Sequence, residues 1–448
     1  MTVIRSAGWV AVALGAVVVL FVGAGTAAAL CKYQFDCHLR PTEPAPTGIE
    51  DFEGSGGGAF ELADGFIGTT VVTGLKSPTD LVFLPDGRML VSEKAGVIRS
   101  VADGALEARP FLDIRPRVND YYFRGIVDIA VDPDFAENPY VYVTYAVQGP
   151  GGDQSKEPIA VRISRFTVRN GVADGSSEEV LIGKEGKPGT SCRALPKGAD
   201  CLPADGDHIG SELVFAPDGT IFVSTGDGGG LEVVEPMAFL SHDLETLGGK
   251  ILHVDREGRG LSSNPWWTGD PTANRSKIWA VGFRNPFRMS LLPGDPDRLL
   301  VGDVGWNSFE ELDVAERGSD YGWPCFEGPE RTPDYQDTTQ CAAYYADAGE
   351  DAAQPWLSTP QPDALSFTAG LSLADARDWP EEYRDRYLYG DWLKSELYTV
   401  PLDPDVPAEN PARFATNAAG PVSFVLSPEG VLYFVAVNTG EIRTIEPR

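Results

Sequence analysis

Only four histidines occur in the 448-residue chain. One of them, His208, follows an aspartate and lies just before a glycine and an apolar strand. The segment from Gly206 reads GDHIGSELVFAPDGTIFVST, so Asp207 and His208 precede an apolar hairpin. Histidine titrates near neutral pH and can accept a proton, and the adjacent carboxylate can bind a hydroxyl group. A histidine that caps a turn is the structural alternative, and these residues alone do not exclude it. We assign structural roles to the other three histidines, which are His38, His242 and His253.

A second segment, IWAVGFRNPFRMSLLP from Ile278, places an arginine and an asparagine together after an apolar strand. Arg284 offers a fork of donors that suits a carboxylate or a developing oxyanion. Its neighbour Asn285 adds an amide at the same strand end. An arginine that only ties down a loop fits this pattern equally well.

A third segment, GDVGWNSFEELDVAERGSDYGWP from Gly302, combines glycine, aromatic and acidic residues. The step at Gly305 and Trp306 can turn backbone carbonyls toward one point, as a calcium site requires. The acids Glu310 and Glu311 can hold a further cation or can simply be solvated. The closing YGWP indicates aromatic packing.

A recurring hairpin must position these residues: an apolar strand, a turn with Pro and Asp or Glu, and a second apolar strand. Five copies begin at Leu81, Ile129, Leu213, Met289 and Phe424, and a looser sixth unit runs from Leu365 to Val400. Proline presets its own φ and glycine accepts positive φ, so these turns reverse the chain. Alternating Val, Ile, Phe and Tyr residues suit strands that pack on both faces.

Six such units predict an all-β fold, a six-bladed β-propeller of four-stranded antiparallel sheets over residues 67–448. A pair of β-sandwiches is the alternative, but it explains the repeated hairpin less well. Loops from every blade of a propeller meet at one end of its central channel. We therefore expect the polar residues at the strand entrances to gather there.

The composition is that of a folded and strongly acidic protein. It contains 50 Gly and 35 Pro without a collagen-like period, which fits many short strands joined by tight turns. The 66 Asp and Glu residues outnumber the 36 Lys and Arg residues, for a formal net charge of -30. This charge repels polyanions, so we exclude nucleic acid as a partner.

The N-terminus has the features of an export signal. Arg5 precedes an uncharged run from Ser6 to Leu30, longer than the about 7–15 apolar residues of a signal peptide and sufficient to span a bilayer. Residues 1–30 are thus expected to be a signal anchor or a cleaved signal peptide. Residues 31–66, rich in Pro, Gly and acid, are expected to be a flexible tether. The propeller would then be exported to the periplasmic or extracellular side, with membrane contact through the N-terminal helix alone.

Export to an oxidising compartment favours disulfide bonds. Six cysteines permit about 15 connectivities, and the simplest one joins neighbours in sequence. Its pairs are Cys31 with Cys37, Cys192 with Cys201, and Cys325 with Cys341. A metal site is the less favoured interpretation, because the spacings lack a Cys-x-x-Cys pair.

The motifs HIGSELVFAPDG, WAVGFRNPFR and GDVGWNSFEELDV with GSDYGWP, in this order, resemble the soluble quinoprotein glucose and sorbosone dehydrogenase family. The resemblance extends over nearly everything from about Val71 onward. It implies an oxidoreductase with a six-bladed propeller that holds pyrroloquinoline quinone (PQQ) on a calcium ion. It also implies an aldose or related sugar or alcohol as substrate and a respiratory electron acceptor.

The resemblance assigns a role to each candidate residue. It implies that His208 takes the proton of the anomeric hydroxyl while hydride passes to the quinone, and that Arg284 polarises the quinone oxygen. Asp207 matches a sugar contact, and Asn285 and Lys394 match cofactor contacts. Gly305 and Trp306 match carbonyl ligands of the cofactor's calcium. Glu311 and the carbonyl of Tyr321 match a structural calcium site.

The chain departs from the family's pattern in two places. Phe123 or Arg124 replaces a polar sugar-binding residue, and Asp128 replaces a glycine. A pair of arginines that clamps cofactor carboxylates before the last hairpin turn is absent, and Arg386 or Arg443 are the expected substitutes. A non-catalytic propeller that binds glycan or protein is therefore the alternative function, and a calcium-dependent lactonase is a weaker one.

Overall fold

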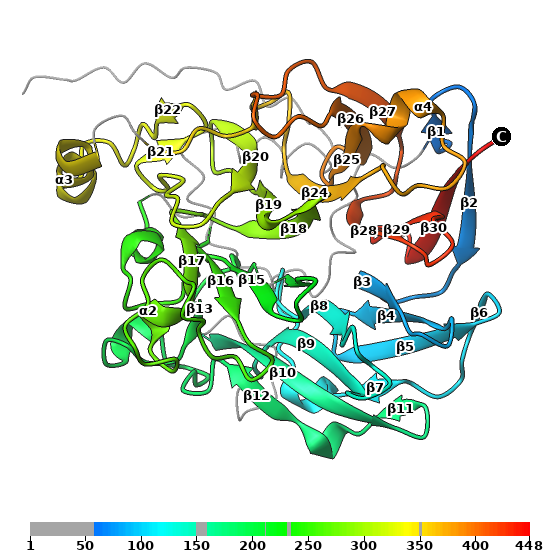
Figure 1. The fold of residues 1–448 in the computed structure, drawn as a ribbon, viewed down its shortest axis with the longest axis horizontal. Coiled ribbons are helices and arrows are strands. Elements are labelled where there is room, and N and C mark those ends of the chain that lie inside the picture. The colour runs from blue at the N-terminus through cyan, green and yellow to red at the C-terminus, as the bar shows by residue number, and fades with distance from the viewer. Residues whose placement is uncertain (1–57, 149–158, 211, 231–233, 349–351) are drawn as a thin grey trace, which may run out of the picture. The chain divides into compact units, whose positions relative to one another are not determined.

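The computed structural model describes residues 58–148, 159–210, 212–230, 234–348 and 352–448. In this part of the chain the strands form six antiparallel sheets and a separate two-stranded ribbon (Figure 1). The first sheet contains β3 (Pro78–Phe83), β4 (Met89–Glu93), β5 (Val97–Ala102), β6 (Ala105–Leu106) and β7 (Leu112–Asp113). The second contains β8 (Ile126–Val131), β9 (Tyr140–Ala146), β10 (Ile159–Arg169), β11 (Val172–Ala173), β12 (Glu179–Ile182) and β13 (Leu202–Ala204). The third contains β14 (Leu213–Phe215), β15 (Ile221–Thr225), β16 (Lys250–Val254) and β17 (Ile278–Val281).

The remaining sheets follow the same pattern. The fourth contains β18 (Pro286–Leu292), β19 (Asp295–Asp303), β20 (Phe309–Ala315) and β23 (Leu357–Pro360). The fifth contains β24 (Phe367–Ser372), β25 (Arg386–Asp391), β26 (Glu396–Pro401), β27 (Ala412–Thr416) and β1 (Glu61–Leu62). The sixth contains β28 (Pro421–Leu426), β29 (Leu432–Ala436), β30 (Glu441–Pro447) and β2 (Phe66–Val72). The ribbon pairs β21 (Phe326–Glu327) with β22 (Glu330–Arg331), and the short helices include α2 (Asn274–Lys277), α3 (Thr339–Ala348) and α4 (Glu381–Arg384).

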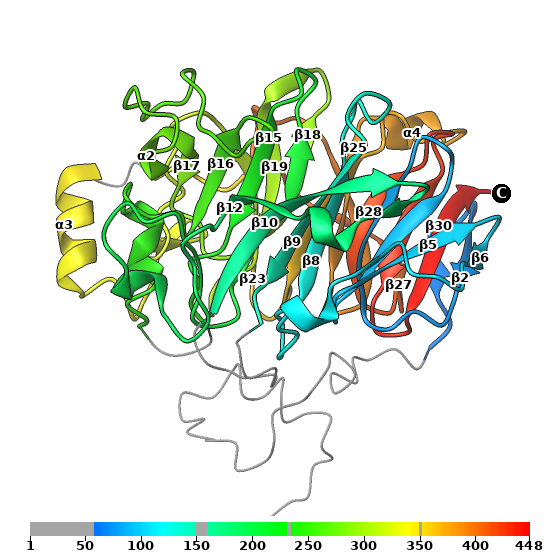
Figure 2. The same ribbon diagram turned by 90° about the horizontal axis from the view of Figure 1, so that it is seen from below.

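The first strands of the six sheets contact one another in a closed circuit. The circuit runs from β3 to β8, β14, β18, β24 and β28, and then back to β3. Each sheet is therefore one blade of a six-bladed propeller, as the repeated hairpin predicts (Figures 1 and 2). The expectation of four strands in every blade is wrong in detail, because short strands from insertions and from the N-terminal segment extend three of the sheets.

The core lies between the blades. Six clusters of buried apolar side chains each join residues of two neighbouring sheets, as Ile98 of β5 and Val143 of β9 do. Strands with apolar residues on both faces are what such packing requires. The rigid ring that results can hold loops in fixed positions at its ends.

The N-terminal strands close the ring, because β2 pairs with β30 and so completes the last blade with the start of the chain. Phe66 is 2% exposed and packs within 5.0 Å of Phe414, ring to ring, while β1 extends the fifth sheet. Residues 58–66, assigned from the sequence to the tether, therefore contribute strands to the propeller. The rest of the expected tether and residues 1–30 lie outside the described residues. Among the described helices, none is both long and apolar enough to cross a bilayer.

Chain direction decides which loops meet. Because adjacent strands in each sheet are antiparallel, the loop that enters the innermost strand and the loop between the second and third strands open at the same end. Asp207, His208, Arg284 and Asn285 precede innermost strands, and Lys394 lies between β25 and β26. We call this side of the propeller the entry end. The turns with Pro and Asp or Glu lie at the opposite end.

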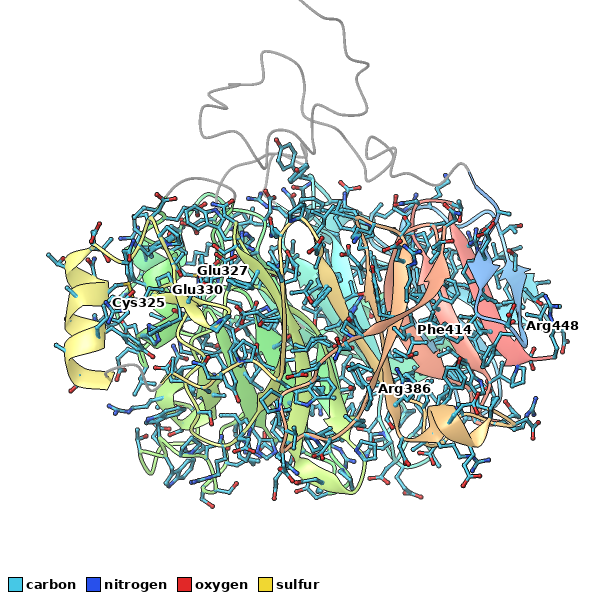
Figure 3. All side chains as sticks on the ribbon, turned by 90° about the horizontal axis from the view of Figure 1, so that it is seen from above. Cys325, Glu327, Glu330, Arg386, Phe414 and Arg448 are labelled. Atoms are coloured by element: carbon cyan, nitrogen blue, oxygen red, sulfur yellow. A yellow bond between two sulfur atoms is a disulfide. The ribbon has the colours of Figure 1, made fainter. Side chains whose placement is uncertain are left out.

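Two of the three expected disulfides are present. Cys192 and Cys201 bond within the loop before β13, and Cys325 bonds Cys341 in α3. Figure 3 labels Cys325 beside the helix that it anchors. The expected pair of Cys31 and Cys37 lies outside the described residues.

Candidate active site

His208 is buried beside a carboxylate that the sequence analysis did not single out. Its Nδ1 lies 2.8 Å from Oδ1 of Asp227, which follows β15. Asp227 is 1% exposed, and its Oδ1 also accepts a hydrogen bond from the Gly229 amide at 2.8 Å. The Asp227 carboxylate therefore fixes the His208 ring with Nδ1 as its donor and leaves Nε2 as the free acceptor. Nε2 is buried and has no hydrogen-bond partner among the described residues.

Glycines allow the two loops that carry this pair to touch. The amide of Gly228 donates to the carbonyl of His208 at 3.1 Å, and the amide of His208 donates to the carbonyl of Gly229 at 3.0 Å. A Cβ atom on Gly226 would lie 2.3 Å from the same His208 carbonyl, so no larger residue fits there. The glycine-rich stretch after β15 thus sets the position of His208.

Arg284, which precedes the first strand of the next blade, contacts the pair of His208 and Asp227. Its backbone carbonyl accepts a hydrogen bond from the Asp227 amide at 2.8 Å. Its guanidinium donates through Nη1 to the carbonyls of Val304 at 2.7 Å and Gly305 at 2.9 Å. Its Nε is buried and has no partner among the described residues. Burial and the positive charge of Arg284 lower the pKa of His208, although Asp227 acts against both.

Trp323 contacts both Arg284 and Asp227, the partner of His208. Its indole Nε1 donates to Oδ2 of Asp227 at 2.8 Å, and its ring lies 5.5 Å from the guanidinium carbon of Arg284. Burial opposes ionisation of Asp227, but His208 and Arg284 together outweigh it and lower the pKa of that carboxyl. His208 and Arg284 therefore lie at one end of the propeller and share Asp227 as a partner.

The Trp323→Phe variant tests this link. It keeps an aromatic ring near Arg284 but removes the donor to the buried Asp227 oxygen. We expect unfolding in urea to require about 1–3 kcal/mol less free energy, because a buried acceptor is left without its partner. A Trp279→Phe variant is the control, since the Nε1 of that buried indole has no partner among the described residues. Equal losses in both variants would contradict the assigned bond.

Asp303 fixes the backbone of Arg284 and Asn285. Its carboxylate accepts from the Arg284 amide at 2.8 Å and from the Asn285 amide at 2.6 Å. Burial raises the pKa of Asp303 to about 7, and these two amides act against the rise. Asn285 in turn accepts through Oδ1 from the amide of Gly210 at 3.2 Å, so its side chain connects to the His208 loop.

The residues expected to hold calcium are close in sequence but have protein partners. The Gly305 carbonyl accepts from Arg284, and Trp306 packs against Trp323 at a centroid distance of 6.3 Å. Glu311 accepts a hydrogen bond from the Gly328 amide, and the ring of Tyr321 stacks on Phe283. Within the described residues, no three Asp, Glu, His or Cys side chains converge as a metal site.

Glu327 is a further residue that the sequence analysis missed. One carboxylate oxygen accepts hydrogen bonds from four consecutive amides, those of Trp306, Asn307, Ser308 and Phe309. This carboxylate fixes the turn that presents the Gly305 and Trp306 carbonyls. Figure 3 shows Glu327 close to Cys325, so the disulfide-bonded insertion supplies this support.

Asp207 lies beside cations rather than beside Asp227. Burial raises its pKa to about 6, and Arg124 and Lys94 partly offset the rise. Arg124 is 1% exposed and donates to three successive carbonyls, those of Ala204, Asp205 and Gly206. Arg124, which stands near a family sugar-binding position, therefore braces the strand that leads to Asp207.

Lys394 and the proposed substitute arginines are not part of this group. Lys394 Nζ donates to the Asp363 carbonyl at 2.5 Å and lies 3.7 Å from Glu396. Arg386 binds Thr399 and, as the first residue of β25, lies at the end opposite the entry end (Figure 3). Arg443 pairs with Glu441 at 2.7 Å. Arg386 is thus excluded as a substitute, because it is at the wrong end.

The fold and the site define a class of protein, a β-propeller with a buried imidazole and guanidinium at its entry end. The model of the Glucose / Sorbosone dehydrogenase family matches residues 75–443, so the chain belongs to that family. The description of this family and the name of one matched relative, an aldose sugar dehydrogenase, both refer to sugar oxidation.

Individual relatives are distant. Aldose sugar dehydrogenase YliI of Escherichia coli is 24% identical over 386 residues, which cover 84% of this chain and 91% of that protein. HIPL2 protein of Arabidopsis thaliana is 30% identical over 262 residues, half of this chain but only 36% of that protein. The PQQ-bound aldose sugar dehydrogenase of Streptomyces coelicolor has the same fold, with a TM-score of 0.59 and 21% identity over 86% of this chain and 100% of that one.

Proposed function

We propose that the chain oxidises an aldose or a related sugar or alcohol with PQQ as hydride acceptor and His208 as base. One observation supports this most directly: a buried imidazole with Nδ1 bound to a carboxylate and Nε2 without a partner in the described structure. Such an arrangement suits a general base that takes a proton from a substrate hydroxyl. A propeller that only binds glycan or protein would not require it. The relatives named as sugar dehydrogenases are consistent with the same chemistry.

The described residues fit the reactive part of the cofactor. Arg284 and Asn285 would hold the quinone, with Lys394 as the expected contact for a cofactor carboxylate. Calcium would bind the carbonyls of Gly305 and Trp306, and the first of these now accepts from Arg284. PQQ, when bound, supplies an electron-poor carbonyl group that accepts hydride.

Residues of the chain would accept the substrate proton and stabilise the charges that form. Nε2 of His208 accepts the proton of the substrate hydroxyl while the anomeric C–H bond breaks and its hydrogen leaves with the electron pair as hydride. Asp227 stabilises the imidazolium that forms, as a carboxylate beside a catalytic histidine does. The Arg284 guanidinium would hold the quinone and place positive charge beside its carbonyl group. The sugar loses two electrons and two protons in total and becomes a lactone.

We also propose that the enzyme works outside the cytoplasm and passes its electrons to a respiratory acceptor. The uncharged run before Leu30 and the disulfides at Cys192 and Cys325 support export. A fusion of residues 1–66 to a reporter that is active only after export would test the location. An inactive reporter, with the fusion protein recovered from the cytoplasm, would contradict it.

Reconstitution tests the activity. The purified propeller is mixed with calcium and PQQ, and reduction of an artificial dye is followed with a panel of aldoses, ketoses and simple alcohols. We expect dye reduction that depends on both the sugar and the quinone, with formation of the lactone. Failure to bind PQQ by calorimetry, together with no dye reduction, would contradict the proposed function.

The pH profile tests the two acid–base groups. His208 must be neutral to accept a proton, and an ionised Asp207 binds a substrate hydroxyl more strongly than a protonated one does. Since burial raises the pKa of Asp207 to about 6, kcat/KM should fall as the pH drops through that value. In the Asp207→Asn variant one ionisation disappears, so the limiting slope of log kcat/KM against pH should decrease from about 2 to about 1. An unchanged slope would exclude Asp207 from substrate binding.

A further inference from the structure

Three aromatic rings meet at the entry end beside the candidate site. The Tyr122 and Phe123 rings lie 4.1 Å apart between centroids, and Phe123 meets Trp392 edge-on at 5.6 Å. The first two residues enter β8 of the second blade, whereas Trp392 follows β25 of the fifth blade. We call these three side chains the aromatic shelf. All three are partly exposed, and Trp392 also packs against the core cluster between the sixth and first blades.

The aromatic shelf is connected to Asp207, the expected sugar contact, through Arg124, which follows Phe123 and donates to the carbonyl of Gly206 at 3.3 Å. Burial raises the pKa of Tyr122 to about 12, and the negative charge of Asp207 adds to that rise. Burial and Asp207 also raise the pKa of the neighbouring Tyr121, whose ring lies 5.9 Å from the guanidinium carbon of Arg124. The two tyrosine hydroxyls therefore lie within electrostatic reach of the carboxylate.

The backbone at the aromatic shelf is held in an unusual conformation. Tyr122 has a φ of 52°, in the left-handed region that bulky residues rarely adopt. Residues in such conformations persist where the surrounding structure imposes them, and they cluster at binding sites. Arg124, two residues on, is anchored to the segment before Asp207 by its bonds to the carbonyls of Ala204, Asp205 and Gly206.

The chemistry of the aromatic shelf indicates its ligand. The ring of Phe123 cannot hydrogen-bond to a sugar hydroxyl, but an aromatic face can pack against the apolar C–H face of a pyranose. Asp207 supplies the hydroxyl acceptor beside it, and Lys394 lies two residues beyond Trp392. Rings from two blades beside a carboxylate therefore suit a second pyranose next to the one that Asp207 contacts.

We propose that the aromatic shelf is a second sugar subsite, which packs against the pyranose ring next to the one that is oxidised. The substrate is then a disaccharide or longer glycan with a free reducing end, in preference to a monosaccharide. This inference rests on the proposed function for its kinetic part, while its binding part stands without that function.

A binding experiment tests the subsite independently of oxidation. Methyl β-cellobioside, methyl β-maltoside and methyl β-glucoside have blocked anomeric carbons, and each is titrated into the quinone-free and the PQQ-loaded protein by calorimetry. We expect at least one disaccharide glycoside to bind more tightly than the monosaccharide glycoside. Phe123→Leu and Trp392→Leu should each weaken disaccharide binding by roughly 3- to 10-fold. No binding preference in either form of the protein would overturn the proposal.

Kinetics give the second measurement. In the two shelf variants the ratio of kcat/KM for cellobiose or maltose to that for glucose should fall by roughly 3- to 10-fold. Phe83→Leu is the matched control, because Phe83 lies in a half-buried ring pair with Tyr433 at the opposite end and should not change the ratio. Equal losses for both sugars, or weaker PQQ binding in the shelf variants, would overturn the proposal. Absence of oxidation with every sugar would contradict the proposed function and leave the calorimetric result to decide.

Discussion

Replacement of His208 by glutamine is expected to lower kcat for sugar oxidation by about 10²- to 10⁴-fold, the usual contribution of a general base. The amide fits the space of the imidazole but cannot accept the hydroxyl proton at neutral pH. Calcium and PQQ should still bind, because Arg284 and Asn285 are unchanged. Single-turnover dye reduction on the PQQ-loaded variant measures the loss directly.

The same substitution at His253 provides the control. His253 stacks on Phe222 at 4.1 Å and bonds Thr220 near the opposite end of the propeller. His253→Gln should therefore leave kcat within a few-fold of the parent. A His208→Gln enzyme that retained most of the parent activity would remove His208 as the base and with it the proposed proton transfer.

Asp227→Asn separates position from proton transfer. The variant keeps a side chain that can bond Nδ1, but it no longer favours the imidazolium that forms on His208. The acid limb of kcat against pH should move to lower pH, because the loss of a nearby negative charge lowers the pKa of the imidazole. A shift toward higher pH would contradict the pairing of His208 with Asp227.

The architecture could be predicted because its signals are local. A turn such as the Pro-Asp-Gly after Leu84 depends on three adjacent residues, and alternation of apolar residues is visible within one strand. Six repeats of one hairpin then leave few possible arrangements. Even the position of His208 and Arg284 at one end follows from their place before innermost strands.

The partners of those residues could not be predicted in the same way. Asp227 lies in a glycine-rich stretch that resembles an ordinary turn, and Trp323, interpreted as packing, meets it across 96 positions of sequence. Glu327 likewise supports the Gly305 turn from an insertion with no repeat pattern. These loops come together only when the ring of blades closes, so local sequence patterns do not predict the contacts of Trp323 with Asp227 or of Glu327 with the Gly305 turn.

Lys394 shows the limit of alignment by motif. The family motif predicts a cofactor contact at Lys394, and in the structure this residue lies in an entry-end loop between β25 and β26. The direction of a long side chain depends on its neighbours, however, and here the Asp363 carbonyl and Glu396 hold the ammonium group. The prediction of a cofactor contact therefore remains to be tested with the bound quinone.

The centre of the ring offers the largest expected change in stability. Arg288 of β18 is buried and donates to the carbonyls of Val422, Thr79 and Val127, which belong to the sixth, first and second blades. It also lies 3.2 Å from Asp128. One guanidinium thus connects the fourth blade to three others at the axis.

Two further carboxylates lie near that guanidinium, and each has its own partners. Asp80 accepts from Ser423 at 2.6 Å and from the Ile129 amide at 3.1 Å. Glu212 accepts from the Met289 amide. Burial raises the pKa of Glu212 to about 8, and Arg288 acts against the rise. Removal of the arginine would leave acidic groups at the axis without a cation.

We therefore expect Arg288→Met to lower the free energy of unfolding by about 3–5 kcal/mol, the cost of leaving one member of a buried ion pair alone. Arg298→Met, which removes a partly exposed ion-paired arginine, should cost about 0–1 kcal/mol. Urea unfolding at pH 7 measures both variants.

The pH dependence identifies the cause of that loss. The acids at the axis bind protons more readily in the folded variant than in the unfolded chain, so its deficit should shrink as the pH falls toward about 4. Addition of Asp128→Asn to Arg288→Met should restore part of the stability, because one unpaired carboxylate is then removed. A deficit that is equal at pH 7 and pH 5, and that the second substitution does not reduce, would show that Arg288 acts through packing instead of charge.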